Sequence, residues 1–270
     1  MRKTAATTGI WIHGSSGRMG KEIQRLIVEQ HPDLRLAGGS SRHFEGEHFH
    51  QGRPVTSELL AQSLAQGEID VVLDFSGVEG NETLIAALAT GKASGKAVLV
   101  GTTGLSDQQL ARWRELADHQ KLKLLIAPNT SLGILLTVKA ALLAAVPLAG
   151  AGFDIEITET HHRAKKDAPS GTARFIADTL AAGVPGLHVT TERQGPRQPG
   201  EIGVHAVRGG GVIGEHEVRL IGDNEEITIS HRAFSRSLFA AGALVLATWL
   251  VRQKPGCYGL LDVAPGDLAT

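Results

Sequence analysis

The sequence predicts an α/β fold in two parts, in which a doubly wound parallel sheet is followed by an α+β part with an open mixed sheet. In the first half, short apolar runs of strand type alternate with helical segments, and each run is almost continuously apolar. Such runs are typical of parallel strands that helices cover on both faces. In the second half, several strand-like runs follow one another instead. A length of 270 residues with 42% hydrophobic content is enough for two cores.

The first half is predicted to alternate strands and helices. Strands are expected at 9–14, 34–41, 69–76, 96–104 and 122–131, and helices at 21–30, 57–66, 81–91 and from residue 106 onward. Ser106 and Gln109 have the spacing of a capping box, which places the start of the fourth helix. Because ligands bind such sheets at the carboxyl ends of the strands, the loops after the strands are the candidate binding segments.

The second half is predicted to contain strands in succession. A helix follows residue 131, strands are expected at 153–162, 187–194, 202–210, 216–222 and 225–233, and helices at 171–182 and 235–253. The turn GDNE at 222–225 predicts an antiparallel hairpin of the last two strands. We therefore expect one domain at 1–130, to which 237–270 returns, and another at 131–236, with the reaction site in the cleft between them.

Composition excludes several classes of partner. The net charge is -1, the sequence pI is about 6.9 and aromatic residues make up 4%, so neither nucleic acid nor a membrane surface is an expected partner. The apolar stretch 132–150 contains Lys139 and Pro147, and 237–251 is too short for a span, so both are expected to be buried helices. With Cys257 as the single cysteine and no leader-like start, a cytoplasmic location is expected.

A glycine-rich turn follows the first predicted strand. Gly14, Gly17 and Gly20 form G-x-x-G-x-x-G between a strand and a helix, which is close to the dinucleotide-binding fingerprint of Rossmann-type domains. The turn would hold a pyrophosphate at the helix N-terminus. A tight turn needs glycine for steric reasons alone, but further small or hydroxyl-rich loops follow the other strands. The candidate cofactor-binding residues of the turn and of these loops are Gly14, Ser15, Ser16, Gly17, Arg18, Met19, Ser41, Arg42, Gly101, Thr102, Thr103, Ala127, Pro128, Asn129 and Thr130.

The end of the second strand predicts the preferred cofactor. Where an acid usually binds the ribose hydroxyls of NAD, this chain has Ser41 and Arg42, which favour a 2′-phosphate, and Arg18 is a second candidate for that phosphate. NADPH is therefore predicted, with NADH as the alternative if Arg42 is only a solvated loop residue. The histidines of 43–50 lack a set of further ligands, so no metal site is expected.

A cluster of basic residues precedes the predicted helix at 171–182. Clustered positive charge suits an anionic small substrate and lowers the pKa of any buried member, so Lys165 or a histidine would serve as a general acid. Ser170, Gly171 and Thr172 begin the helix, where a carboxylate is well held. On the charges alone, a solvated basic loop with a helix cap would be the better interpretation. The cluster consists of His161, His162, Arg163, Lys165 and Lys166.

Residues 156–173, EITETHHRAKKDAPSGTA, resemble the signature of the 4-hydroxy-tetrahydrodipicolinate (dihydrodipicolinate) reductases. Essentially the whole chain shares the resemblance, because further motifs follow in the expected order. They are GSSGRMG (14–20), DFS (74–76), GTTG (101–104), APNTS (127–131), VRGGGVIGEHEV (207–218) and ITISHRAFSR (227–236).

The resemblance implies NAD(P)H-dependent reduction of a cyclic dicarboxylate in lysine and diaminopimelate biosynthesis. It implies that 14–19, 101–103 and 127–130 bind cofactor in a dinucleotide-binding domain, and that the other domain binds substrate and oligomerises. His161 would be the proton donor and acceptor, and Lys165 the proton donor. His162, Gly171 and Thr172 would hold substrate carboxylates. It further implies a homotetramer built through the second sheet, and domains that close on the ligand.

The chain departs from the family's common residues at three positions, and two alternative functions are also compatible with the sequence. Ser41 replaces a common acid, Thr130 replaces a common aromatic residue and Ser16 replaces a glycine of some members. The alternatives are a related NADPH-dependent amino-acid or amino-ketone dehydrogenase and a catalytically silent nucleotide sensor. The presence of both His161 and Lys165 argues against the sensor. Outside the basic cluster, His205, His216 and His231 are expected to have structural roles.

Overall fold

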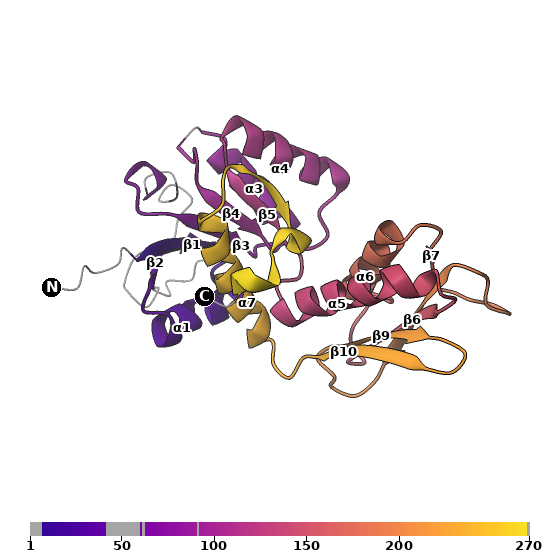
Figure 1. Cartoon of the computed structure of the whole chain (residues 1–270). Helices are drawn as coiled ribbons and strands as arrows, with labels where there is room; N and C mark the ends of the chain where they lie inside the picture. The colour runs from indigo at the N-terminus through magenta and orange to yellow at the C-terminus, as the bar shows by residue number, and fades with distance from the viewer. Residues whose placement is uncertain (1–6, 42–59, 61–62, 91, 269–270) are drawn as a thin grey trace. The chain divides into compact units, whose positions relative to one another are not determined.

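The computed structural model describes residues 7–41, 60, 63–90 and 92–268. The chain divides into two compact units, which Figure 1 shows with their elements labelled. The first unit comprises Met1–Ser131 and Phe239–Thr270, and the second comprises Leu132–Leu238. Both units combine a sheet with helices, as predicted for an α/β protein.

The first unit contains a six-stranded parallel sheet in the order β11-β5-β4-β3-β1-β2. Its strands are β1 (Thr8–His13), β2 (Leu34–Ser40), β3 (Val71–Asp74), β4 (Ala97–Val100), β5 (Lys123–Ile126) and β11 (Gly256–Gly259). Its helices are α1 (Arg18–Gln30), α3 (Val78–Leu88), α4 (Asp107–His119) and α7 (Ser237–Val251), followed by the 3₁₀ turns η1 (Leu260–Asp262) and η2 (Pro265–Leu268). Strand β11 was not predicted. Half of the helix expected at 57–66 lies outside the described residues, and residues 60 and 63–65 of the described half are helical.

The sheet is buried on both faces, which explains why its strands are largely apolar. Trp11, Val72 and Val98 pack in one cluster with residues of α3 and α4, among them the fully buried Leu84 and Trp113. Helices α1 and α7 lie on the other face (Figure 1). The predicted capping box at Ser106 is confirmed, because its hydroxyl accepts the Gln109 N–H while the Gln109 side chain accepts the Ser106 N–H.

The order of the strands places the glycine turn at the point where the connections reverse direction. From β1 the chain proceeds outward to β2 on one side, and it then returns to add β3, β4 and β5 on the other side. The carboxyl ends of β1 and β3 are therefore neighbours, joined by the pairing of His13 with Asp74. In open parallel sheets, ligands bind at this switch point.

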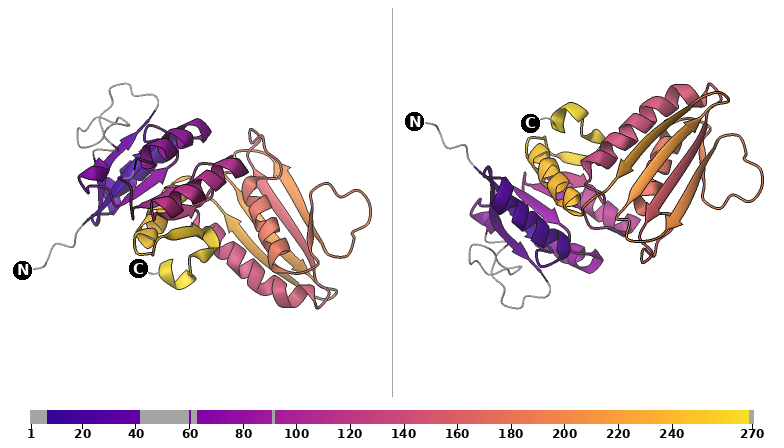
Figure 2. Two further views of the ribbon diagram at one scale, coloured as in Figure 1. Left: turned by 90° about the horizontal axis from the view of Figure 1, so that it is seen from above. Right: turned by 90° about the horizontal axis from the view of Figure 1, so that it is seen from below.

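The second unit contains a five-stranded mixed sheet in the order β10-β9-β6-β8-β7. Its strands are β6 (Asp154–His161), β7 (His188–Thr190), β8 (Glu201–Arg208), β9 (Glu215–Ile221) and β10 (Glu226–Arg232). Strands β9 and β10 form the predicted antiparallel hairpin, whereas β6 pairs in parallel with β8. The predicted open mixed sheet is confirmed. Figure 2 shows helices α5 (Leu132–Ala149) and α6 (Gly171–Gly183) against one face of this sheet.

Helix α5 is long and apolar enough, by length and composition alone, to cross a membrane. It packs against α6 and against strands β6, β9 and β10, with Leu135, Val138 and Ala141 fully buried. Within the second unit it therefore serves as a core helix that covers the sheet.

Candidate active site

The glycine turn after β1 is shaped by close backbone contacts. Gly14 has φ of +88°, and a Cβ there would lie 2.5 Å from the Phe75 carbonyl oxygen. A Cβ on Gly20 would lie 2.5 Å from the Gly14 carbonyl oxygen. The amides of Gly14 and Ser15 donate to the Ser40 carbonyl at 2.8 and 3.1 Å. Only glycine fits at positions 14 and 20, so the turn stays compact.

The turn leads directly into α1, whose N-terminus fits a phosphate group. The helix begins at Arg18, earlier than the predicted Lys21, and Gly17 is its N-cap without a side-chain cap. An uncapped helix start presents free amide groups and the positive end of the helix dipole to an anion. The predicted residues 14–19 therefore form an arrangement that suits a dinucleotide pyrophosphate.

The residues predicted to contact a 2′-phosphate are described only in part. The Ser16 and Ser41 hydroxyls hydrogen-bond each other, which joins the glycine turn to the end of β2. Arg18 is exposed at the first position of α1. Arg42 and the histidine-containing stretch 43–50 lie outside the described residues.

A buried carboxylate at the end of β3 organises the next two loops. Asp74 is fully buried and accepts hydrogen bonds from Ser76 Oγ at 2.6 Å, Asn81 Nδ2 at 2.7 Å and Thr102 Oγ1 at 2.8 Å. Thr102 belongs to the predicted cofactor loop after β4, so Asp74 fixes that loop against β3. The DFS motif at 74–76 contains this acid, but its role in holding the loops was not predicted. The signal was an acid at the end of a buried strand beside loops rich in hydroxyl groups.

In the loop after β4, Gly101 lies against an aromatic ring. A Cβ on Gly101 would be 2.2 Å from the Phe75 ring, and the Gly101 amide donates to the Asp74 carbonyl at 2.9 Å. Thr103 is exposed. The buried Thr102 is thus an anchor of the loop, and Thr103 is the member available to a ligand.

The loop after β5 holds the returning C-terminal segment. Thr130 is buried and its hydroxyl donates to the Phe239 carbonyl at 2.7 Å. The Asn129 carboxamide accepts the Ser131 N–H at 2.9 Å. Ala127 is buried, while Pro128 is exposed. In place of the family's common aromatic residue, Thr130 therefore ties this loop to the start of α7.

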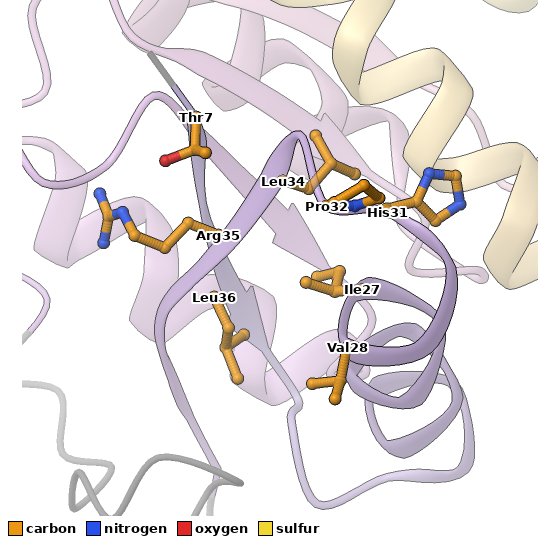
Figure 3. Close-up of a pocket in the computed structure, with 8 residues that line it drawn as sticks. All are labelled: Thr7, Ile27, Val28, His31, Pro32, Leu34, Arg35 and Leu36. Carbon is orange, nitrogen blue, oxygen red and sulfur yellow. The ribbon is translucent and has the colours of Figure 1, made fainter. Parts of the chain in front are cut away.

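A pocket of about 320 Å³ lies elsewhere in the first unit (Figure 3). It is found at the C-terminal end of α1 and the start of β2, away from the glycine turn, which precedes the other end of α1. Its residues were not predicted as site residues, and we assign no function to it. They are Thr7, Ile27, Val28, His31, Pro32, Leu34, Arg35 and Leu36.

In the second unit, a buried ion pair lies at the carboxyl end of β6. Glu159 is fully buried and accepts two hydrogen bonds from Arg208, at 2.8 and 2.7 Å. The Ser170 backbone N–H donates to the same carboxylate at 2.9 Å. Burial pushes the pKa of Glu159 upward, but the hydrogen bonds from Arg208, His161 and Ser170 outweigh it and lower that pKa overall. The carboxylate is therefore ionised.

The predicted catalytic His161 contacts this carboxylate. Its Nδ1 lies 2.5 Å from Glu159 Oε2, and its side chain is 10% exposed. An ionised carboxylate only accepts hydrogen bonds, so Nδ1 carries the proton and Nε2 is the free basic atom. Burial lowers the pKa of His161, and the charges of Lys165 and Arg208 lower it further against the opposing effect of Glu159. A Cβ on Gly214 would lie 3.0 Å from Nε2, so glycine keeps that side of the ring open.

A second histidine packs against His161. The rings of His161 and His216 meet edge to face with centroids 5.2 Å apart, and His216 Nε2 lies 3.2 Å from Ser170 Oγ. Burial lowers the pKa of His216 to about 3, so this residue is neutral. His216 has the hydrogen-bonded role expected of it, but its place beside His161 was not predicted.

The remaining predicted residues lie in the loop after β6 and at the start of α6. Lys165 Nζ lies 2.8 Å from Asp167 Oδ1, and this ion pair lowers the pKa of Asp167. His162 and Thr172 are half-buried, and Gly171 is exposed. The buried Ser170 accepts the Ala173 N–H at 3.1 Å and so caps α6. Its hydroxyl is engaged within the protein, whereas Gly171 and Thr172 occupy the first turn of the helix.

In the parts of the chain that the structure describes, no three His, Cys, Asp or Glu residues are grouped closely enough to hold a metal ion. The chemistry-bearing groups of the second unit are instead the His161–Glu159–Arg208 chain and the Lys165–Asp167 pair. An imidazole and an ammonium beside the start of α6 suit proton transfer on an anionic substrate.

Comparisons with known proteins agree along the whole chain. Residues 8–130 match the family model "Dihydrodipicolinate reductase, N-terminus", and 133–264 match "Dihydrodipicolinate reductase, C-terminus". The 4-hydroxy-tetrahydrodipicolinate reductase of Caldanaerobacter subterraneus subsp. tengcongensis is 41% identical, over 93% of this chain and 96% of the relative. The Aquifex aeolicus enzyme of the same name is 38% identical at the same coverage.

A solved structure of a dihydrodipicolinate reductase also matches the chain. The dipicolinate-bound dihydrodipicolinate reductase of Paenisporosarcina sp. TG-14 is 28% identical with a TM-score of 0.74, covering 96% of this chain and 100% of that one. An engineered D-amino acid dehydrogenase bound to NADP⁺ is 15% identical with a TM-score of 0.56, which shows a shared fold alone. The first unit is thus of the NAD(P)-binding Rossmann type. With both of its units matched over nearly their full length, the chain belongs to the dihydrodipicolinate reductase family.

Proposed function

We propose that this chain reduces 4-hydroxy-tetrahydrodipicolinate to tetrahydrodipicolinate with NADPH, in lysine and diaminopimelate biosynthesis. The observation that carries the proposal is the buried His161–Glu159–Arg208 chain beside Lys165, directly before the Ser-Gly-Thr start of α6. These residues stand within a chain that matches the family along both units. A catalytically silent nucleotide sensor would leave this set of proton-transfer groups without a task, and the family match along both units argues against a related dehydrogenase.

The cofactor would be held by the first unit. Its pyrophosphate would bind at residues 14–19, and 101–103 and 127–130 would bind the remainder, with Asp74 and Thr130 fixing the two later loops. When bound, the cofactor supplies the hydride for the reduction. The fit rests on the glycine turn, where side chains at positions 14 and 20 would collide with backbone atoms.

The proton would come from Lys165. His161 is neutral near pH 7 because burial lowers its pKa, and its protonated Nδ1 is held by Glu159. Its Nε2 therefore accepts protons, whereas the ammonium of Lys165 has protons to give. We assign donation to the reduced ring to Lys165, and acceptance and relay of the proton to His161. The 4-hydroxyl would leave as water together with a proton of the adjacent ring carbon, so the reduction itself consumes one hydride from the cofactor and the one proton that Lys165 donates.

The substrate carboxylates would be held at the start of α6. The Gly171 and Thr172 amides lie in the first turn of the helix, where the dipole favours an anion. His162 and the Thr172 hydroxyl would add hydrogen bonds, and Ser170 would contribute by shaping the turn. Positive charge around the ring would stabilise the electron density that develops on hydride transfer.

NADPH oxidation tests the activity directly. Freshly formed condensation product of aspartate semialdehyde and pyruvate is added to enzyme and NADPH, and the absorbance of NADPH is expected to fall. Each substrate precursor added alone is the control. An unchanged absorbance with intact NADPH binding would favour the nucleotide sensor. Activity with amino acids instead would favour the related dehydrogenase.

The cofactor preference is expected to favour NADPH. We expect kcat/KM to be at least about 10-fold higher with NADPH than with NADH, the effect of one charge-assisted contact to the 2′-phosphate. Arg42→Met should reduce this ratio. Arg25→Met is the matched control, because Arg25 pairs with Glu22 and Glu29 on α1. Equal efficiencies, or a preference for NADH, would overturn this part of the proposal.

Thr172→Val is expected to weaken substrate binding alone. Loss of one hydrogen bond to a carboxylate should raise KM for the substrate by about 10-fold. The dissociation constant of NADPH, measured by fluorescence titration, should be unchanged. Thr179→Val, the same change later in α6, is the control. A lost nucleotide affinity in Thr172→Val would contradict the assignment.

We also propose a homotetramer in the cytoplasm, on the basis of family resemblance and of the sheet in the second unit. Within residues 132–238, both helices pack on one face of that sheet (Figure 2). The other face carries polar side chains such as Thr158, Glu217 and Thr228. A sheet with an uncovered face and free edges favours self-association.

A further inference from the structure

We propose that Glu159 is the positioning residue of His161, and that Arg208 holds its carboxylate in place for this task. The inference rests on the proposed function, in which His161 accepts and relays a proton. It adds two residues to the reaction that were not among the predicted site residues. Both belong to the second unit, so the whole arrangement lies within one compact unit.

The strand register brings the three side chains together. Strand β6 is the centre of its sheet, with β8 on one side and β9 on the other. His161 pairs with Arg208 on β8, and Glu159 pairs with His216 on β9. Glu159 and His161 are two residues apart on one strand, so their side chains lie on the same face. That face is the one that α5 and α6 cover, which keeps the contact dry.

The hydrogen bonds of Glu159 determine which ring nitrogen of His161 carries the proton. Oε1 accepts from Arg208 and from the Ser170 amide, while Oε2 accepts from Arg208 and from His161 Nδ1. Every partner donates, so the carboxylate must be ionised and Nδ1 must carry the proton. Consequently Nε2, beside Gly214, is the nitrogen left to exchange protons. The contact thus selects the tautomer and the orientation of the ring.

Arg208 secures this arrangement in turn. Its guanidinium binds the carboxylate through two nitrogens and also donates to the Asp167 carbonyl at 2.6 Å. The hydrogen bond to the Asp167 carbonyl ties the loop that carries Lys165 to the same cluster. The charged and titratable groups around His161 are Glu159 on β6, Arg208 on β8, His216 on β9, and Lys165 and Asp167 in the following loop, with His231 on β10 behind His216.

Glu159→Gln tests the proposal because it keeps the shape and removes the charge. The Ser170 amide requires an oxygen at the Oε1 position, so the amide nitrogen would face His161 Nδ1 and force the other tautomer. We expect kcat to fall at least about 10-fold, a part of the roughly 10²–10⁴-fold that a positioned acid or base contributes. Substrate KM and NADPH affinity should change little. Glu159→Asp, which restores the charge, should recover part of kcat.

A matched control exists on the same strand. Glu156 is bound by Arg193 and Arg197 and lies 2.6 Å from His205 Nε2, so it repeats the carboxylate–arginine–histidine pattern on the other face of the sheet. Glu156→Gln should leave kcat and its pH dependence unchanged. If Glu156→Gln lowers kcat as much as Glu159→Gln does, the effect is loss of an ion pair in β6 and the proposal is wrong.

Two readouts separate positioning from mere stability. In Glu159→Gln the inflection of kcat/KM that belongs to His161 should move to lower pH by about one unit, the effect of losing one charge-assisted hydrogen bond. NMR titration of the His161 ring in the full cofactor-free chain, assigned with His161→Gln, should show the same shift and a changed tautomer. An unshifted titration overturns the proposal. Absence of reductase activity in the unsubstituted protein would instead refute the proposed function, and the NMR result would still decide the contact.

Discussion

Lys165→Met is expected to lower kcat at least about 100-fold, the lower limit of what a positioned general acid contributes. Methionine keeps the apolar stem of the side chain and removes only the ammonium group. Lys165 is the group with protons to give, because His161 is neutral with its one proton bound to Glu159. The lysine side chain is 22% exposed and its ammonium lies 2.8 Å from Asp167, so it is held in place while still open to a ligand.

Lys166→Met separates proton donation from general positive charge. Lys166 is exposed and directly follows Lys165, so the same substitution removes the same charge one residue further along. We expect turnover close to that of the unsubstituted enzyme. Single-turnover measurements would show whether the hydride-transfer step itself is slowed. Near-normal turnover in Lys165→Met would remove Lys165 from the mechanism. Equal losses of turnover in both variants would mean that the basic cluster acts only through its positive charge and contains no specific proton donor at Lys165.

The elements of the fold were predictable wherever a local sequence pattern specified them. Each strand of the first unit from β1 to β5 contains a largely apolar run, and Ser106 with Gln109 marked the start of α4. Strand β11 has the sequence GCYG, which has no such pattern. It forms because the end of α7 delivers it to the edge of the sheet, where the Gly256 amide donates to the Leu122 carbonyl at 2.9 Å. Such an edge strand depends on its neighbour rather than on its own residues.

The site was predictable as segments, but its contacts were not. His161, Lys165 and the Ser-Gly-Thr turn stand close together in the sequence, so a single motif indicated them. The partner of Glu159 comes from a different strand, and the parallel register of β6 with β8 determines that it is Arg208. Register arises from packing across the whole sheet, and a pattern within one strand does not specify it. For the same reason the contact of His216 with His161 was missed.

Gly14→Ala is expected to destabilise the first unit and to abolish tight NADPH binding. The positive φ of +88° costs an alanine about 1–2 kcal/mol. The new Cβ would lie 2.5 Å from the Phe75 carbonyl oxygen and 2.7 Å from Ser76 Cα, and such overlap adds about 1–3 kcal/mol. Together these terms correspond to a fall in Tm of roughly 5–15 °C for a chain of this size. Both colliding atoms are backbone, so the turn itself must move away from β3.

Gly95→Ala is the control that separates strain from overlap. Gly95 has a similar φ of +73°, but a Cβ there would meet no atom within 4 Å. Gly95→Ala should lower Tm only by the part that the positive φ causes, without the part caused by overlap. It should leave NADPH affinity unchanged in fluorescence titration. In Gly14→Ala the dissociation constant should rise at least about 10-fold, since one charge-assisted hydrogen bond to a phosphate is worth that much. If Gly14→Ala binds NADPH normally, the close approach of the turn to Phe75 is not what shapes the nucleotide site. If Gly95→Ala loses as much affinity, the effect is general strain, and the fit of the glycine turn to a pyrophosphate has no support from this experiment.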